Sequence, residues 1–242
     1  MLQAVLFDLD DTLLGNNMDT FIPHYFSLLS RYAETKMARD DFLRELMICT
    51  RAMVESRETA VSNRDVFWGA FQQRTGLDPE EMEQFFDIFY RDHFPQLAPV
   101  TTPQAGARDI VEFCFDQGWQ VVIATNPMFP RRAVEHRLAW AGLAVTEYPF
   151  SLVTTYENMH ATKPHLAYYE EILTRIGVPA AAALMVGDDW ENDIEPAARL
   201  GCHTYWIGEV TTPADPAFPA ANGSLTRLHE LLQAGWPLNG TT

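Results

Sequence analysis

The sequence predicts an α/β fold, a doubly wound, mostly parallel, Rossmann-like sheet that is interrupted by an inserted all-helical segment. Short apolar segments alternate with amphipathic ones from about residue 104 to residue 233, and strands that alternate with helices pair in parallel through right-handed crossovers. Residues 16–95 instead show helical spacing of apolar residues without a convincing strand. We therefore expect two domains, a core of residues 1–15 and 96–242 and a helical cap of residues 16–95.

The composition is that of a globular protein and excludes several partners. The chain has 242 residues, 47% of them hydrophobic, and a formal net charge of −16. Nucleic acids and anionic membranes bind basic surfaces, so we expect neither as a partner. No stretch approaches the roughly 20 apolar residues that span a membrane. The first strand begins without a leader, and Cys49, Cys114 and Cys202 match no disulfide or metal spacing, so we expect a reducing, cytoplasmic location.

The first predicted strand ends in a cluster of carboxylates. Residues 4–7 (Ala-Val-Leu-Phe) are typical of a strand covered on both faces, and Asp8, Asp10 and Asp11 follow them. Because clustered carboxylates repel one another and resist burial, they need a positive charge nearby, such as a hard divalent cation. If the pleat continues, Asp8 and Asp10 point to the same side, so one can attack while the other carries a proton. The alternative is a plain turn or a helix N-cap.

Helices are predicted throughout the inserted segment, after a turn at residues 15–17. The first carries Phe21 to Leu29, and the others lie at about 39–57, 64–74 and 78–94. Asp40 or Asp41 should open the second helix, and Asp78 should cap the fourth. The stretch 95–103 contains three prolines and predicts a stiff, extended connector.

The core elements follow this connector in alternation. We expect helices at about 104–117, 130–141, 164–176, 191–200 and 224–233, and strands at 119–124, 150–154, 183–186 and 203–207. A proline-rich loop is expected at 211–219.

Two further polar clusters contain groups suited to phosphate binding. Thr125 and Asn126 end a predicted strand, where a hydroxyl, an amide and backbone N–H groups can donate to phosphate oxygens; an ordinary turn before proline is the alternative. Lys163 is one of two lysines beside fifteen arginines. That choice indicates a need for a compact ammonium group, although a solvated lysine before a helix is the alternative.

The fourth cluster, Gly187-Asp188-Asp189, again places acids at the end of a buried strand. Asp188 can ligate a cation together with Asp8, and Asp193 can brace water or Lys163. Asp189 can be an ordinary helix cap. Because ligands of open α/β sheets lie beyond the carboxyl ends of the strands, these clusters should converge.

In this order, the four clusters resemble the four signatures of the haloacid dehalogenase superfamily. The resemblance is to its phosphatase form with a helical C1 cap, similar to phosphoglycolate phosphatase-like members of subfamily I. The matching residues are Asp8-x-Asp10-x-Thr12, Thr125, Lys163 and Gly187-Asp188-x-x-x-x-Asp193.

The resemblance implies a phosphoric monoester hydrolase that uses Mg²⁺, an aspartyl-phosphate intermediate and a small phosphorylated metabolite as substrate. Its nucleophile would be Asp8 and its acid and base Asp10, with catalytic Lys163 beside them. The resemblance assigns the remaining roles as follows: metal ligands Asp8, Asp188 and the backbone carbonyl of Asp10; phosphate-binding groups Thr125, Asn126 and Lys163; supporting residues Thr12, Asp189 and Asp193.

Other functions of the same superfamily are distinguished by single residues. A sugar-phosphate mutase shares all four motifs and is the main alternative. Dehalogenases lack the second aspartate, so Asp10 disfavours that reaction. Phosphonate-cleaving members need a cap lysine, and the one available, Lys36, looks solvated. A catalytically silent binding or regulatory protein would usually have lost a motif residue, and none is missing.

The inserted segment should select the substrate, because a cap over the site admits small molecules and excludes water. Asn16, Asn17 and Met18 directly follow the catalytic strand and are the expected contacts. Arginines of the cap, Arg51, Arg57 and Arg64, can bind a second anionic group or can be solvated. The motifs leave the identity of the metabolite and the oligomeric state open.

Overall fold

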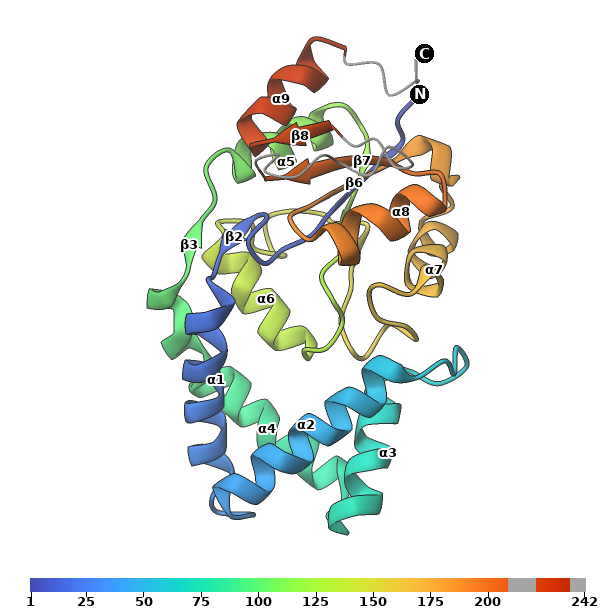
Figure 1. Cartoon of the computed structure of the whole chain (residues 1–242). Helices are drawn as coiled ribbons and strands as arrows, with labels where there is room; N and C mark the ends of the chain where they lie inside the picture. Colours follow the sequence, from blue (N-terminus) through green and yellow to red (C-terminus); the bar gives the residue numbers. More distant parts are fainter. Residues whose placement is uncertain (209–220, 236–242) are drawn as a thin grey trace.

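The structure is a computed structural model, and it describes residues 1–208 and 221–235 (Figure 1). Its centre is a six-stranded sheet in the order β5–β4–β1–β6–β7–β8, and every pairing among these described strands is parallel. The strands are β1 (Ala4–Phe7), β4 (Gln120–Ile123), β5 (Leu152–Val153), β6 (Ala183–Gly187), β7 (His203–Ile207) and β8 (Ala221–Gly223). The predicted α/β fold with a mostly parallel sheet is therefore confirmed.

Strand β1 lies at the point where the order of the strands reverses. The chain continues from β1 to β4 and β5 on one side, and then to β6, β7 and β8 on the other. Alternate residues of β1 point into two different cores: Val5 and Phe7 into one, Ala4 and Leu6 into the other. Both faces are covered, which explains the unbroken apolar sequence of the strand.

Helices cover the two faces of the sheet and fix the positions of its strands. Helices α5 (Ala107–Asp116), α6 (Arg131–Trp140) and α9 (Leu225–Gln233) pack on the face of Val5 and Phe7. Helices α7 (Leu166–Ile176) and α8 (Glu195–Arg199) pack on the opposite face. A π-helical turn, Trp190–Ile194, leads directly into α8, where the sequence predicts one continuous helix.

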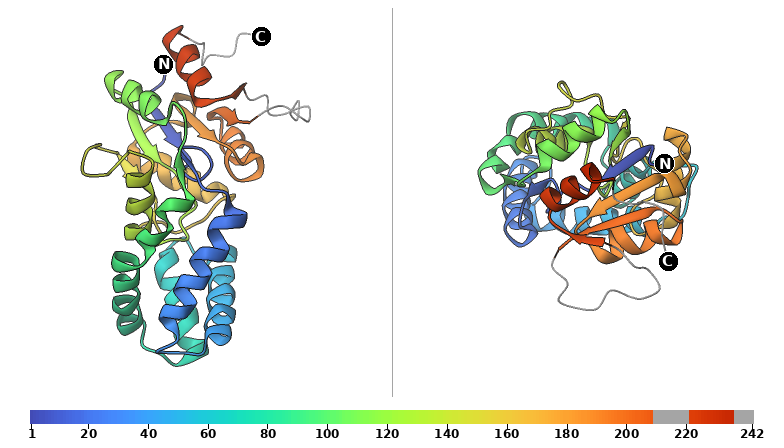
Figure 2. Two further views of the ribbon diagram at one scale, coloured as in Figure 1. Left: turned by 90° about the vertical axis from the view of Figure 1, so that its left-hand side faces the viewer. Right: turned by 90° about the horizontal axis from the view of Figure 1, so that it is seen from above.

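Four helices between β1 and β4 form a group with its own core. They are α1 (Met18–Ala33), α2 (Arg39–Glu55), α3 (Asn63–Thr75) and α4 (Pro79–Asp92). Aromatic side chains such as Phe21, Trp68 and Phe89 fill this core. Figures 1 and 2 show the group at the end of the elongated molecule opposite to α9. Asp78 caps α4 as predicted, since its Oδ1 accepts from Glu81 N over 2.9 Å.

The structure corrects several local predictions. Residues Phe94–Val100 form a 3₁₀ helix instead of an extended connector, because prolines at its start and interior fit short helical turns that need few backbone donors. The predicted turn at residue 15 is part of a two-residue strand, β2 (Leu14–Gly15), paired antiparallel with β3 (Thr102–Pro103). Helix α2 begins after Ala38, and neither Asp40 nor Asp41 caps it. Strand β8 was not predicted, and the loop at 211–219 lies outside the described residues.

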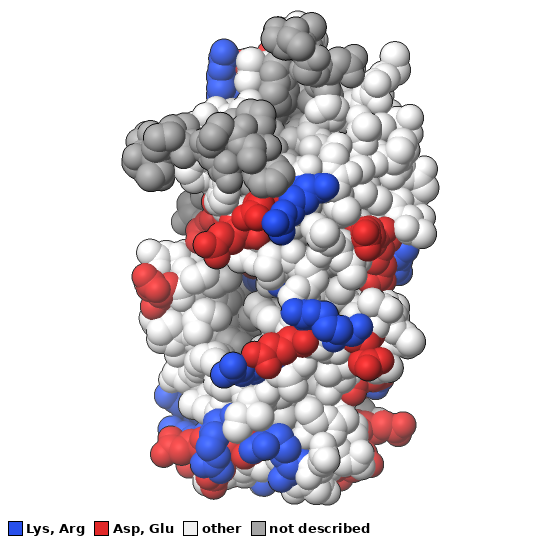
Figure 3. Space-filling model, turned by 45° about the vertical axis from the view of Figure 1, so that its right-hand side comes forward, with Lys and Arg blue, Asp and Glu red and all other residues white. Residues whose placement is uncertain are grey.

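The helices and the drawn surface bear on the expectation that membranes and nucleic acids are not partners. Within the described residues, no helix has the length and apolar character needed to cross a bilayer. On the face drawn in Figure 3, basic and acidic side chains are interspersed, without a continuous basic patch.

Candidate active site

The Asp8 carboxylate follows β1 and contacts a buried ammonium group. Lys163 Nζ lies 2.6 Å from Asp8 Oδ1 and 2.5 Å from Asp193 Oδ1, and Lys163 is 3% exposed. Burial would lower the pKa of Lys163, but the charges of Asp193 and Asp8 outweigh it and hold that pKa well above its ordinary value. Lys163 is therefore a charged bridge between two carboxylates, and the solvated alternative is excluded.

Asp188 follows β6, which pairs directly with β1. Thr12 Oγ1 donates to Asp188 Oδ1 over 3.1 Å, and Trp206 Nε1 donates to the Asp188 carbonyl over 2.7 Å. Burial, and then the charge of Asp8, raises the pKa of Asp188 to about 7. Burial also raises the pKa of Asp8 to about 7, although Lys163 opposes the shift. Thr12 thus contacts Asp188, and its predicted supporting role stays a prediction.

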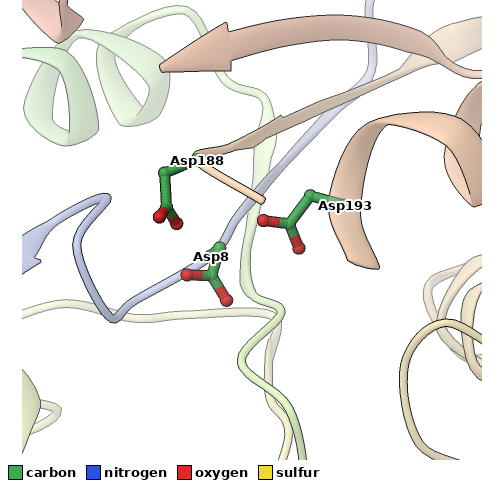
Figure 4. A group of neighbouring side chains, drawn as sticks. All are labelled: Asp8, Asp188 and Asp193. Atoms are coloured by element: carbon green, nitrogen blue, oxygen red, sulfur yellow. The ribbon is translucent and has the colours of Figure 1, made fainter. Parts of the chain in front are cut away.

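The carboxylates of Asp8, Asp188 and Asp193 fit a divalent cation. One oxygen of each can be chosen so that all lie within 4.8 Å of one another, and Figure 4 shows the three groups facing a common space. Lys163 compensates only part of their charge, which leaves an excess negative charge in a buried site. Oxygen donors of this kind are the ligands that Mg²⁺ and Ca²⁺ prefer.

This set overlaps the predicted ligands and adds Asp193. In the prediction Asp10 contributes only its backbone carbonyl. That contribution stays a prediction, as do the roles assigned to the individual site residues.

Gly187 makes room for Asp193 beside the end of β6. A Cβ atom at position 187 would lie 2.1 Å from Asp193 Oδ2, far inside contact distance. The same Oδ2 accepts a hydrogen bond from Asp189 N over 3.2 Å. Asp189 itself accepts from Asn192 N over 3.0 Å and caps the following turn. The contacts of Asp189 are therefore those of a helix cap, which is the alternative given for it from the sequence.

The Asp10 carboxylate is held at both of its oxygens. Asn16 Nδ2 donates to Oδ1 over 2.8 Å, and Arg137 Nη1 donates to Oδ2 over 2.6 Å. Asp11 N also donates to Asn16 Oδ1 over 3.3 Å, and Asn16 N donates to Asp11 Oδ1 over 3.1 Å, across a turn in which Asp11 has φ 55°. The motif therefore bends away from strand geometry after Asp8, and Asp10 contacts a different set of partners from Asp8.

Thr125 and Asn126 follow β4, which pairs with β1 on the side opposite to β6. The Thr125 carbonyl accepts from Thr154 Oγ1 over 2.6 Å and from Tyr168 OH over 2.9 Å, which fixes the loop after the strand. Asn126 Oδ1 is buried without a hydrogen-bond partner among the described residues. Thr125 and Asn126 thus lie at the same sheet edge as Asp8 and Asp188, as predicted.

The three residues expected to contact the substrate have different partners in the structure. Asn16 is completely buried and its side chain is used by Asp10 and Asp11. Asn17 caps α1, where its Oδ1 accepts from Thr20 N over 3.3 Å. Met18 packs against the core of the helical group. None of these contacts tests the predicted role in specificity.

The three arginines of the helical group that were expected as possible anion ligands, and Lys36, each have a partner in the structure. Arg51 pairs with Glu55 at 2.8 Å, and Arg64 pairs with Glu83 and Asp65. Arg57 Nη1 lies 2.6 Å from His165 Nε2. Lys36, expected to be solvated, is only 31% exposed at its side chain and pairs with Glu81 at 2.6 Å. This lysine is thus bound to helix α4, which gives no support to a Schiff-base role.

A cavity of about 780 Å³ lies between the helical group and the loop after β4. Aromatic side chains dominate its lining, among them Tyr25, Trp68 and Phe129. The lining includes neither Asp8 nor Lys163. The ring of Phe129 contacts the Arg137 guanidinium, whose carbon lies 4.5 Å from the ring centroid.

Arg137 is the site residue that sequence reasoning missed. It lies on the buried face of α6 with Ala133, Val134 and Leu138. An arginine among apolar residues on one helix face was the available signal, because a charge is rarely placed there without a partner. The partner itself comes from a distant part of the chain.

Comparisons with known proteins show which proteins this chain is similar to. A curated relative, "Haloacid dehalogenase-like hydrolase domain-containing protein 3" of Xenopus laevis, is 33% identical over 54% of this chain and 49% of its own, so the match spans about half of that relative. "Pyrophosphatase PpaX" of Halalkalibacterium halodurans is 23% identical over 86% of this chain and 84% of its own. The solved 2-haloacid dehalogenase of Pseudomonas syringae has the same fold, with a TM-score of 0.61 at 22% identity, over 97% of this chain and all of that one.

The family comparison extends over most of the chain. The model described as "Hydrolase: haloacid dehalogenase-like hydrolase" matches residues 2–201, a range that includes β1, the helical group and each of the four polar clusters. The chain belongs to the haloacid dehalogenase-like hydrolases.

Proposed function

We propose that this hydrolase is a Mg²⁺-dependent phosphatase that cleaves a small phosphorylated metabolite through an aspartyl-phosphate on Asp8. The observation that carries the proposal is the Asp8 carboxylate itself, bonded to buried Lys163 over 2.6 Å and grouped with Asp188 at the sheet edge. When bound, Mg²⁺ would supply positive charge for the phosphoryl oxygens and the carboxylates. The residues that would hold it are Asp8 and Asp188, with the Asp10 carbonyl and Asp193 as further candidates.

The chemistry divides between two aspartates. An Asp8 oxygen attacks phosphorus and forms the acyl phosphate, while Asp10 gives a proton to the departing oxygen. Asp10 then takes a proton from the water that attacks the acyl phosphate, which releases inorganic phosphate and restores both groups. Lys163 stabilises the charge on Asp8 and the phosphoryl group, and Thr125 and Asn126 bind other oxygens.

The second aspartate also favours hydrolysis of a phosphate ester over displacement of halide. A leaving alkoxide needs a proton and a halide does not. Asp10 is present and hydrogen-bonded at both oxygens. A mutase would use the same groups, and it differs in returning the phosphoryl group to the sugar instead of to water.

The helical group is proposed to be a cap of residues 16–95 over a core of residues 1–15 and 96–242. The antiparallel pair of β2 with β3 supports this division, because this separate two-stranded sheet lies where the chain enters and leaves the helical group. The three cysteines are free and buried, which supports the proposal of a reducing, cytoplasmic environment.

The test is phosphate release from a panel of phosphorylated metabolites, with Mg²⁺ and with EDTA. Wild-type protein should release phosphate only with the metal, and Asp8→Asn should lose nearly all turnover. Asp19→Asn, an exposed aspartate of α1, is the matched control and should keep full activity. Substantial turnover in Asp8→Asn would place the nucleophile elsewhere, and isomer formation in place of phosphate release would identify a mutase.

A further inference from the structure

A completely buried arginine lies behind the proposed acid and base. Arg137 has 0% exposure, and its Nη1 lies 2.6 Å from Asp10 Oδ2. Asp10 is the one acid with which it forms an ion pair among the described residues. Its Nε makes a longer contact of 3.4 Å to the Ala133 carbonyl of its own helix. The charge of Arg137 is thus directed at Asp10.

The other contacts of Arg137 compensate little for the burial of its charge. The Phe129 ring lies against the guanidinium at 4.5 Å, a contact that favours a cation. Arg137 Nη2, however, is buried without a hydrogen-bond partner among the described residues. Replacing both partners of a buried ion pair by apolar side chains is often neutral for stability, whereas removing one partner leaves the other charge unpaired. Stability therefore gives little reason for the Asp10–Arg137 pair as a whole, and Arg137 is needed only where Asp10 is kept.

The contacts determine the orientation of the Asp10 carboxylate. Arg137 holds Oδ2, and Asn16 Nδ2 holds Oδ1 over 2.8 Å. Two donors on opposite oxygens fix the rotation of a carboxyl group, which a single donor would not. Asp10 also lies outside β1 and directly before a turn in which its neighbour Asp11 has positive φ, so a regular strand does not fix its orientation.

We propose that Arg137 is a positioning residue that orients the Asp10 carboxyl group for proton transfer to the leaving oxygen. This inference rests on the proposed function. Arg137 keeps its own protons throughout, and the transferred proton passes from Asp10 to the leaving oxygen. Its effect should therefore scale with how much the leaving group needs that proton.

Two aryl phosphates of similar shape provide the measurement. Phenyl phosphate has a basic leaving group that needs protonation, whereas 4-nitrophenyl phosphate has a weakly basic one that leaves with little help. Arg137→Met should lower kcat/KM for phenyl phosphate by about 100-fold. The loss of kcat/KM for 4-nitrophenyl phosphate should be about tenfold smaller, because kcat/KM reports phosphoryl transfer to Asp8 and excludes the later hydrolysis step that both esters share. Arg137→Lys, which keeps the charge, should recover part of the loss.

Leu138→Ala is the matched control, because Leu138 is also buried in α6 and has no contact with Asp10 among the hydrogen bonds described. It should lower Tm and leave the ratio of the two kcat/KM values unchanged. If Arg137→Met alters that ratio no more than Leu138→Ala does, Arg137 has only a structural role and the proposal is overturned.

A double variant keeps the test decisive if Arg137→Met folds poorly. Asp10→Asn removes the charge left unpaired, so Asp10→Asn/Arg137→Met should fold better than Arg137→Met alone. With 4-nitrophenyl phosphate, the double variant should be no slower than Asp10→Asn, because Arg137 acts only through Asp10. Independent, multiplying losses would contradict the proposal. A wild-type protein that releases no phosphate from these esters or from any metabolite of the panel, or full activity in Asp8→Asn, would instead refute the proposed phosphatase.

Discussion

At the scale of single residues, the site contains few positive charges and several negative ones. Asp8 and Asp193 share the ammonium group of Lys163, and Asp188 has only the Thr12 hydroxyl as a side-chain partner among the described contacts. A carboxylate in such a place ionises reluctantly, which is why the pKa of Asp8 and of Asp188 rises to about 7. The arrangement is costly without a further cation and suited to binding one.

Removing the ammonium group should destabilise the protein strongly. In Lys163→Met, two buried carboxylates lose their shared partner, and we expect a loss of about 3–5 kcal/mol in the free energy of unfolding at pH 8. Urea unfolding measures it. Lys36→Met is the matched control, since Lys36 makes an exposed pair with Glu81, and it should cost less than about 1 kcal/mol. Equal losses of unfolding free energy in the two variants would mean that Lys163 stabilises the protein no more than the Lys36–Glu81 pair does.

At the scale of elements, the Asn63 side chain is one of several links between the helical group and the loops of the site. Asn63, at the start of α3, is 1% exposed. Its Nδ2 donates to the Ala161 carbonyl over 3.1 Å and to the Pro127 carbonyl over 3.4 Å. These carbonyls belong to the loops that carry Lys163 and Asn126, so α3 holds both loops at once.

Asn63→Ala should therefore affect both stability and catalysis. Two buried carbonyls lose a donor, which should cost about 1–3 kcal/mol in urea unfolding, and kcat/KM should fall because the phosphate-binding loops lose a tether. Asp78→Ala removes a helix cap of α4 distant from these loops, and should cost about 1 kcal/mol with kcat/KM unchanged. An Asn63→Ala enzyme with unaltered kcat/KM would show that the tether is irrelevant to the reaction.

The elements also show what the sequence can and cannot predict. Strand β1 and the groups at strand ends were predictable, because their signals lie within a few consecutive residues and the parallel order brings them together. The contact of Arg137 with Asp10 joins residues 127 positions apart and has no local signature beyond a charge on an apolar face. Strand β8 depends on pairing with β7, which overrides weak local preferences.

At the scale of the whole molecule, metal binding and stability should be linked through pH. The pKa of Asp8 and of Asp188 is about 7 in the folded protein, whereas the ordinary pKa of an aspartate is 3.8. Between these limits the folded state holds more protons than the unfolded state, so these two groups make the metal-free protein less stable as pH rises from about 4 to 7. A divalent cation binds the ionised carboxylates and opposes this loss.

Mg²⁺ should consequently raise Tm more at pH 8 than at pH 5.5, as thermal unfolding with and without the ion would measure. Asp188→Asn should remove most of the increase. The neighbouring Asp189→Asn should keep it, because Asp189 caps a turn and lies outside the three-carboxylate group. A larger increase at pH 5.5, or equal effects of the two variants, would argue against this metal site.

The central claim is that Asp8 forms a covalent bond to phosphorus during turnover. Acid quenching of the enzyme with its best substrate and Mg²⁺, followed by mass spectrometry of peptides, measures this most directly. We expect a phosphoryl group on the peptide that contains Asp8, and we expect no phosphoryl group on the same peptide of Asp8→Asn. Steady turnover with the phosphoryl group found on another residue would contradict it.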